Sequence, residues 1–85
     1  MVSRKKILAR ALSAPANMSF KDLVSLVEAF GFALSRVNGS HHIYTHSDIP
    51  ELVNIQNVKG KAKPYQIRQF LRLVERHNLR MEDEK

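Results

Sequence analysis

Apolar residues recur with a helical period in two parts of the chain. The first part runs from Ser19 to Gly31. Its apolar residues lie three and four positions apart: Phe20, Leu23, Val24, Val27 and Phe30. Ser19 is a favourable N-cap with Asp22 three residues later, in a near capping-box spacing, and Gly31 suits the C′ position. This pattern predicts a helix with one buried stripe.

The second helical part begins at Pro64, which suits the first position of a helix, and should end near Asn78. Its buried stripe is expected to consist of Ile67, Phe70, Leu71 and Val74. The helix also carries an arginine every four residues, which predicts one solvent-facing cationic row: Arg68, Arg72 and Arg76. Such a row is more often a solubilising face than a binding face, although it would also suit an acidic protein partner.

Three stretches between these helices have the β-branched and aromatic content of strands: residues 32–37, 40–46 and 52–56. In the third stretch, Val53 and Ile55 share one face. Residues 47–51, which include Pro50, are typical of a connection. The chain therefore alternates helix, strands and helix around one small core.

The dipeptide Asn38-Gly39 favours a two-residue type I′ turn between the first two strands, because both positions of that turn need positive φ. This loop would place Arg36 opposite His41. One face of the hairpin, the expected core face, would then carry Phe32, Leu34, Arg36, His41, Ile43 and Thr45. The other would carry Ser35, Val37, His42, Tyr44 and His46. A β-bulge would exchange the faces of the two adjacent histidines.

This order of elements predicts an α+β, two-layer fold with a three-stranded antiparallel sheet covered on one face by the last two helices. We expect residues 1–18 to be a basic extension, residues 19–80 the functional domain and residues 81–85 a tail. A short helix from Ser3 to Leu12 should lay three apolar residues on the fold: Leu8, Ala11 and Leu12. The acid-free start of the chain would also fit an organellar transit peptide, but the short helix is the favoured interpretation.

Composition narrows the possible functions. The net charge of +6 over 85 residues suggests a polyanionic partner, with nucleic acid first. The chain has no cysteine, which excludes disulfides and thiolate metal sites. No apolar run approaches the ~20 residues of a membrane span. A small nucleic-acid-directed domain without a membrane segment is the class that remains.

Two adjacent histidines follow the predicted turn, and cations lie on both sides of them. RNA carries its own nucleophile, the 2′-hydroxyl, so a ribonuclease needs little more than proton transfer and cations for the phosphate. His41 is the candidate proton-transfer group, and the candidate phosphate-binding residues are Arg36, Lys59, Lys61 and Lys63. The plainer alternatives are a histidine that caps the sheet edge and a solvated lysine loop.

Other chemistry is less favourable. His42 and His46 would lie about 13 Å apart on one strand, too far for both to bind one metal ion. Phe32 and Tyr44 could stack on bases, but packing in the core explains both residues more simply. The sequence therefore predicts neither a metal nor another cofactor.

The segment from Phe20 to Leu79 resembles the HicA-type toxins, the mRNA interferases of bacterial HicA–HicB toxin–antitoxin systems. The resemblance rests on a helix that ends in Glu-Ala-Phe-Gly-Phe, a Gly-Ser-His-His-Ile-Tyr hairpin, a third strand, a Gly-Lys-Ala-Lys-Pro loop and a closing helix that ends in Asn-Leu. It implies a fold like that of a double-stranded-RNA-binding domain. The short N-terminal helix is additional to that fold.

The resemblance also implies metal-independent cleavage of RNA by the histidine of the Gly39-Ser40-His41 motif, in the bacterial cytoplasm. His42 is the second choice, since some relatives place their histidine one position later. The implied partners are mRNA and a HicB-like antitoxin that covers the active surface. Many relatives carry a Pro-Arg-His-like segment where this chain has Gln56-Asn57-Val58, which implies a slow enzyme with one proton-transfer group. The alternatives are an RNA-binding or antitoxin-pairing module without catalysis and a purely structural interaction protein.

Overall fold

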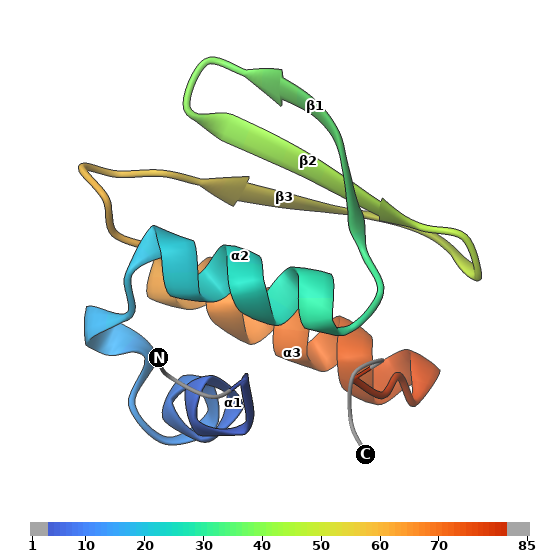
Figure 1. Cartoon of the computed structure of the whole chain (residues 1–85), viewed down its shortest axis with the longest axis horizontal. Coiled ribbons are helices and arrows are strands. Elements are labelled where there is room, and N and C mark those ends of the chain that lie inside the picture. The colour runs from blue at the N-terminus through green and yellow to red at the C-terminus, as the bar shows by residue number, and fades with distance from the viewer. Residues whose placement is uncertain (1–3, 82–85) are drawn as a thin grey trace.

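The computed structural model describes residues 4–81, which form one helical layer and one three-stranded sheet. The elements in chain order are α1 (Arg4–Ser13), the 3-10 helix η1 (Pro15–Asn17), α2 (Phe20–Ala29), β1 (Ala33–Asn38), β2 (His41–His46), β3 (Ile49–Gln56) and α3 (Pro64–His77). The sheet is antiparallel with strand order β1-β2-β3. All three α-helices lie on one face of it (Figure 1). This arrangement confirms the α+β two-layer prediction; Ser3 and residues 82–85 lie outside the described part.

The start and end of α2 follow the sequence signals. The Ser19 hydroxyl accepts a hydrogen bond from the Asp22 backbone N–H at 3.1 Å, as an N-cap does. Gly31 has φ of +94°, the left-handed conformation expected just beyond a helix. The helix buries Phe20, Leu23, Leu26, Val27 and Ala29. Both helix ends are therefore encoded locally.

Helix α3 begins at Pro64 and is capped by Asn78 in the left-handed conformation, as expected. Its buried face is rotated slightly from the predicted stripe. Leu73 is buried whereas Leu71 and Val74 are only partly buried, and Gln66 joins Ile67 and Phe70 inside. The rotation brings a polar residue into the core, which the apolar pattern did not indicate.

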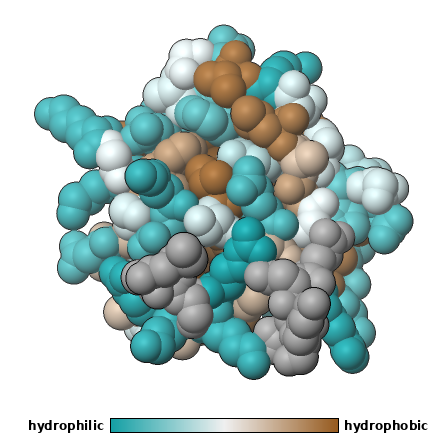
Figure 2. Space-filling model, in the orientation of Figure 1, coloured by the Kyte–Doolittle hydropathy of each residue, from teal (hydrophilic) through white to brown (hydrophobic). Residues whose placement is uncertain are grey.

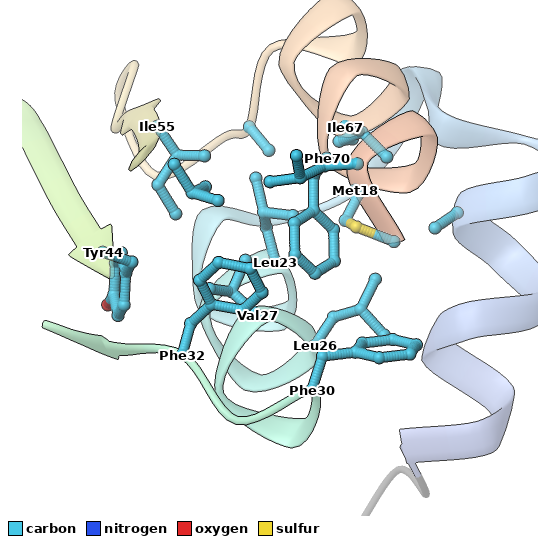
Figure 3. Packing of buried hydrophobic residues seen from close by; sticks show 14 of the residues in the cluster. Met18, Leu23, Leu26, Val27, Phe30, Phe32, Tyr44, Ile55, Ile67 and Phe70 are labelled. Carbon is cyan, nitrogen blue, oxygen red and sulfur yellow. The ribbon is translucent and has the colours of Figure 1, made fainter. Parts of the chain in front are cut away.

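The core lies between the sheet and the helices (Figure 3). Phe70 of α3 is its centre, since the rings of Phe30 and Phe32 pack edge-on against it at centroid distances of 5.7 and 5.6 Å. Leu23 and Leu26 from α2 and Ile55 from β3 have almost no exposed surface. Residues from both layers thus meet in one cluster.

Helix α1 packs on α2 and α3 through Ile7 and Ala11, which are both buried. Arg10 Nη1 lies 3.6 Å from Asp22 Oδ2, an ion pair between α1 and α2. Leu8 packs against the core as predicted, but the prediction for Leu12 is wrong, because its side chain is 66% exposed at the end of the helix. Ile7 takes the buried position because it and Ala11 are four residues apart on one face.

Strand β3 begins at Ile49, three residues earlier than the sequence suggested. Pro50 is tolerated there because β3 is an edge strand, where a missing N–H costs no ladder bond. The turn between β2 and β3 is short, and the Asp48 N–H donates to His46 Nδ1 at 3.0 Å. The expected connection is therefore mostly strand.

Candidate active site

The hairpin turn lies one residue later than predicted. Asn38 pairs with His41, so the loop consists of Gly39 and Ser40 rather than Asn38 and Gly39. Gly39 has φ of +64°, while neither Asn38 nor Ser40 has positive φ. Positive φ at the first central residue alone is the φ pattern of a type II′ turn, which also matches strand twist. The predicted type I′ loop was therefore wrong.

A β-bulge at Ser35 accompanies this shift. Leu34 pairs with Tyr44 and Arg36 pairs with Ile43, which leaves Ser35 as an extra residue in β1. Arg36 thus does not lie opposite His41 as predicted. The bulge lets the turn move by one residue while the outer part of the ladder stays paired.

The predicted faces of β2 are reversed. Tyr44 is 2% exposed in the core, and it pairs with Val53 of β3 while His42 pairs with Ile55. Val53 and Ile55 are buried, so their partners also face the helices. His41 consequently lies on the outer face, which carries no helix (Figure 1).

His41 is held by its neighbour on β3. Its Nδ1 lies 3.1 Å from Asn54 Oδ1, so the imidazole donates its Nδ1–H to the amide oxygen. In the neutral ring this leaves Nε2 as the unprotonated nitrogen, and Nε2 has no partner among the described residues. Arg36 is a diagonal neighbour of His41 on the same face. Sheet geometry places the Cα atoms of such neighbours about 7–8 Å apart. The outer face therefore presents a base beside a cation.

His42 lies on the helix side of the sheet. Its ring packs on Phe20 at a centroid distance of 4.8 Å, at the first turn of α2. Its Nδ1 lies 3.3 Å from the Ser40 carbonyl oxygen. The ring is thus fixed by a packing contact as well as by a hydrogen bond.

The lysine loop is tied to the start of α2. The Phe20 N–H donates to the Gly60 carbonyl at 2.9 Å, and the Ala62 N–H donates to the Met18 carbonyl at 3.1 Å. Lys59 and Gly60 both have positive φ, and the Asn57 side chain accepts from the Gly60 N–H at 2.7 Å. These bonds give the loop a defined course.

The same loop also contacts the hairpin turn. The Asn57 N–H donates to the Ser40 carbonyl at 2.9 Å. We call this part of the molecule the turn end: the β1–β2 turn, residues 57–63 and the first turns of α2 and α3 (Figure 1). Its cations are Lys21, Lys59, Lys61 and Lys63, and none forms an ion pair with a described residue.

The predicted site residues therefore divide between two sides of the sheet. Arg36 accompanies His41 on the outer face. The backbone of the lysine loop contacts the start of α2, where Phe20 packs on His42. Gly39 and Ser40 lie in the turn that joins both sides.

A buried glutamine connects α3 to this turn, and sequence reasoning missed it. Gln66 Oε1 accepts from the Gln56 N–H at 2.8 Å, and Gln56 Nε2 donates to Ser40 Oγ at 3.2 Å. Gln66 is 6% exposed. Its position is in helical phase with Phe70 and Leu73, and that phase was the available signal.

The two aromatic residues considered for stacking, Phe32 just before β1 and Tyr44 in β2, cannot stack on bases. Phe32 and Tyr44 are buried in the core, as the simpler interpretation held. Burial, with a smaller contribution from the charge of Glu28, raises the pKa of the Tyr44 phenol above 10.0. The phenol therefore stays neutral near neutral pH.

Within residues 4–81, no group of three or more histidine or acidic side chains is arranged to hold a metal ion. No helix in that range has the length and apolar character needed to cross a membrane.

Comparison with known proteins gives one family. The model of the HicA toxin of bacterial toxin–antitoxin systems matches residues 20–75. That segment contains α2, the complete sheet and most of α3, while α1 precedes it. Neither the curated proteins nor the solved structures gave a significant match. Because the match covers well over half of the chain, and the fold is the one expected for that family, the protein belongs to the HicA toxin family.

Proposed function

We propose that this protein is a metal-independent mRNA interferase, an endoribonuclease that acts in the bacterial cytoplasm as the toxin of a toxin–antitoxin pair. His41 is the proton-transfer residue. Family membership supports the toxin role, and the surroundings of His41 support the chemistry. The observation that carries the proposal is that Asn54 holds Nδ1 of His41 on the open face of the sheet, while Nε2 has no partner within residues 4–81.

The reaction uses the nucleophile of the substrate. His41 Nε2 takes the proton of a ribose 2′-hydroxyl, whose oxygen then attacks the adjacent phosphorus. The bond from phosphorus to the 5′-oxygen breaks, and that oxygen takes up a proton. The products are a 2′,3′-cyclic phosphate and a 5′-hydroxyl. In the reverse assignment, His41 is the acid that protonates the leaving oxygen.

The cations have two different roles in this scheme. Arg36 shares the outer face with His41 and stabilises the charge that develops on the reacting phosphate. Lys59, Lys61 and Lys63 hold the neighbouring part of the strand through its backbone charge. Gly39 and Ser40 position the histidine through the turn.

His42 remains the second choice for proton transfer. The ring of His42 packs on Phe20 on the helix side of the sheet, and this packing is sufficient to explain a histidine at that position. Its Nδ1 also bonds to a carbonyl, which leaves Nε2 unprotonated in the neutral ring. The two histidines therefore have to be separated by experiment.

The partner of the toxin is a HicB-like antitoxin that covers the active surface. The positive charge of the turn end suits an acidic surface on that partner. An antitoxin that covers the outer face around His41 would prevent RNA from reaching the histidine.

Cleavage of a defined RNA in EDTA tests the proposal. The wild type should cleave slowly and leave 2′,3′-cyclic phosphate ends, His41→Ala should lose at least about 100-fold in rate, and His42→Ala should retain cleavage. Thermal unfolding of each variant shows whether it is folded. Unchanged cleavage by folded His41→Ala, with loss in His42→Ala, would transfer the role to His42. Intact RNA after long incubation with the wild type, together with salt-dependent RNA affinity, would support the non-catalytic binding module instead.

A further inference from the structure

A groove of about 350 Å³ lies between strand β3 and helix α3. Asn54 lines it on the strand side, and Gln69 and Arg72 line it on the helix side. Asn54 is also the residue that holds His41. Asn54 thus belongs both to the lining of the groove and to the support of the candidate catalytic histidine, which lies across the edge strand β3 from α3.

Helix α3 carries an exposed aromatic residue among polar ones, directly before Gln66, which lines the groove. Tyr65 is 51% exposed in the first turn of the helix. Arg68, Gln69 and Arg72 follow it at spacings of three, four and seven residues, which place all four on one side of the helix. All four are exposed. We call Tyr65, Arg68, Gln69 and Arg72 the Tyr65 face.

The arginines of this face are not neutralised within the described part of the chain. Arg68 and Arg72 have no ion pair with a described residue, in contrast to Arg76, whose Nη1 lies 3.4 Å from Glu51 Oε2. The Tyr65 face also follows directly after Lys63 and the other lysines of the turn end. The cations of the Tyr65 face are thus close in the chain to the lysines that precede α3.

An exposed aromatic ring within positive charge matches the chemistry of unpaired RNA. Lysine and arginine bind the backbone of any nucleic acid, but an aromatic side chain stacks on bases only where they are not already stacked in a duplex. An acidic protein would use the arginines without needing the ring. The combination therefore favours a single strand.

We propose that the Tyr65 face and the adjoining groove bind the single-stranded RNA substrate, with one base stacked on Tyr65 and phosphates on Arg68 and Arg72. The inference rests on the proposed function and specifies its substrate as an unpaired strand.

Figure 2 shows that, in this view, hydrophobic atoms on the surface gather mainly in the upper part, where Figure 1 draws the sheet. The apolar residues exposed on β1 are Leu34 and Val37, and they belong to a strand at the other edge of the sheet from β3.

Binding of a uniformly 2′-O-methylated single strand and of a duplex of the same length tests this inference. The modified strand has no free 2′-hydroxyl, so affinity is measured without cleavage. Tyr65→Ala should weaken single-strand binding at least about fivefold and duplex binding less than about twofold, and Tyr65→Phe should restore it. The double variant Arg68→Gln/Arg72→Gln should lower the slope of log K against log salt by about 1.4, two phosphates at ~0.7 each. Arg80→Gln removes a single charge from an exposed arginine beyond the end of α3; it is the control for a charge outside this face and should behave like the wild type.

Several results would overturn the inference. One is that the wild type and Tyr65→Ala bind the single strand with equal affinity. Another is that Tyr65→Ala loses as much affinity for the duplex as for the strand. The third is that the wild type does not bind the strand. Normal RNA binding by the arginine variant with lost antitoxin binding would assign the face to a protein partner. A wild type that binds the strand through Tyr65 but leaves unmodified RNA intact would refute the proposed function alone.

Discussion

The side chain of Gln66 accepts a hydrogen bond from the backbone N–H of Gln56 at 2.8 Å. Gln56 ends β3 and is the cross-strand partner of His41. An edge strand leaves outward-pointing N–H groups without a ladder partner, and here a helix supplies the acceptor. The first turn of α3 is thereby fixed against the strand that supports the candidate catalytic residue.

Replacing Gln66 by leucine should destabilise the protein by about 1–3 kcal/mol, because the Gln56 N–H would lose its partner in a partly buried position. Urea unfolding gives the free energy of unfolding directly. Gln69→Leu is the matched control on the exposed side of α3 and should change stability by less than about 0.5 kcal/mol. Equal effects in the two variants would show that the hydrogen bond contributes nothing measurable.

Replacing Gly39 by alanine should cost about 1–2 kcal/mol of stability. Gly39 has φ of +64°, and a Cβ atom there would meet nothing within 4 Å, so the cost is backbone strain rather than a clash. Asn38→Ala, at the adjacent position without positive φ, is the control and should be milder. Thermal unfolding measures both variants. A larger effect in Asn38→Ala would favour the turn centred on Asn38 and Gly39.

Replacing Ser19 by alanine should cost about 1 kcal/mol, because the Asp22 N–H would lose its cap. Ser13 is a suitable control, since its hydroxyl only donates to the Ala9 carbonyl on the exposed side of α1. Ser13→Ala should be close to neutral in urea unfolding. If Ser19→Ala is also neutral, the lysine loop alone holds the start of α2.

Glu51 should make stability depend on acid pH. The hydrogen bond from His77 is the main cause that lowers the pKa of the Glu51 carboxyl below 4.5, and Arg76 adds to it. A carboxyl with a lower pKa in the folded than in the unfolded chain contributes stability above the unfolded value. That contribution is lost as the pH falls through the folded value.

The wild type should therefore exceed Glu51→Gln in free energy of unfolding at pH 7, and the difference should disappear as the pH falls below 4.5 and through the lowered pKa of the folded carboxyl. Because the carboxyl is exposed to solvent, a small difference is expected. Urea unfolding at several pH values measures it. Glu75→Gln, an exposed acid of α3, is the control. A difference that grows on acidification would contradict the assignment.

The helices were predictable because their signals are local. Ser19, Pro64 and the positive-φ positions Gly31 and Asn78 mark ends that depend on a few adjacent residues. The buried faces of β3 were also predictable, since Val53 and Ile55 alternate with polar residues.

The faces of β2 were not predictable from β1 and β2 alone, because the hairpin has apolar residues on both sides. Pairing with β3 determines the faces of β2, because Val53 and Ile55 require Tyr44 and His42 beside them on the helix side of the sheet. The sequence therefore identified both histidines of the candidate site but exchanged their surroundings. Gln66 was missed because it is polar, although it is in helical phase with Phe70 and Leu73, and Tyr65 was missed because no motif singles it out.

The β-bulge at Ser35 affects how the edge strand β1 can pair with a strand of another copy of this protein. β1 forms one edge of the sheet, and all six of its residues are exposed, including Leu34 and Val37. A regular edge with such side chains would be open to continued strand addition, whereas a bulge interrupts the repeat that another chain must match. One inserted serine thus protects a cationic, partly apolar border from self-association into larger aggregates.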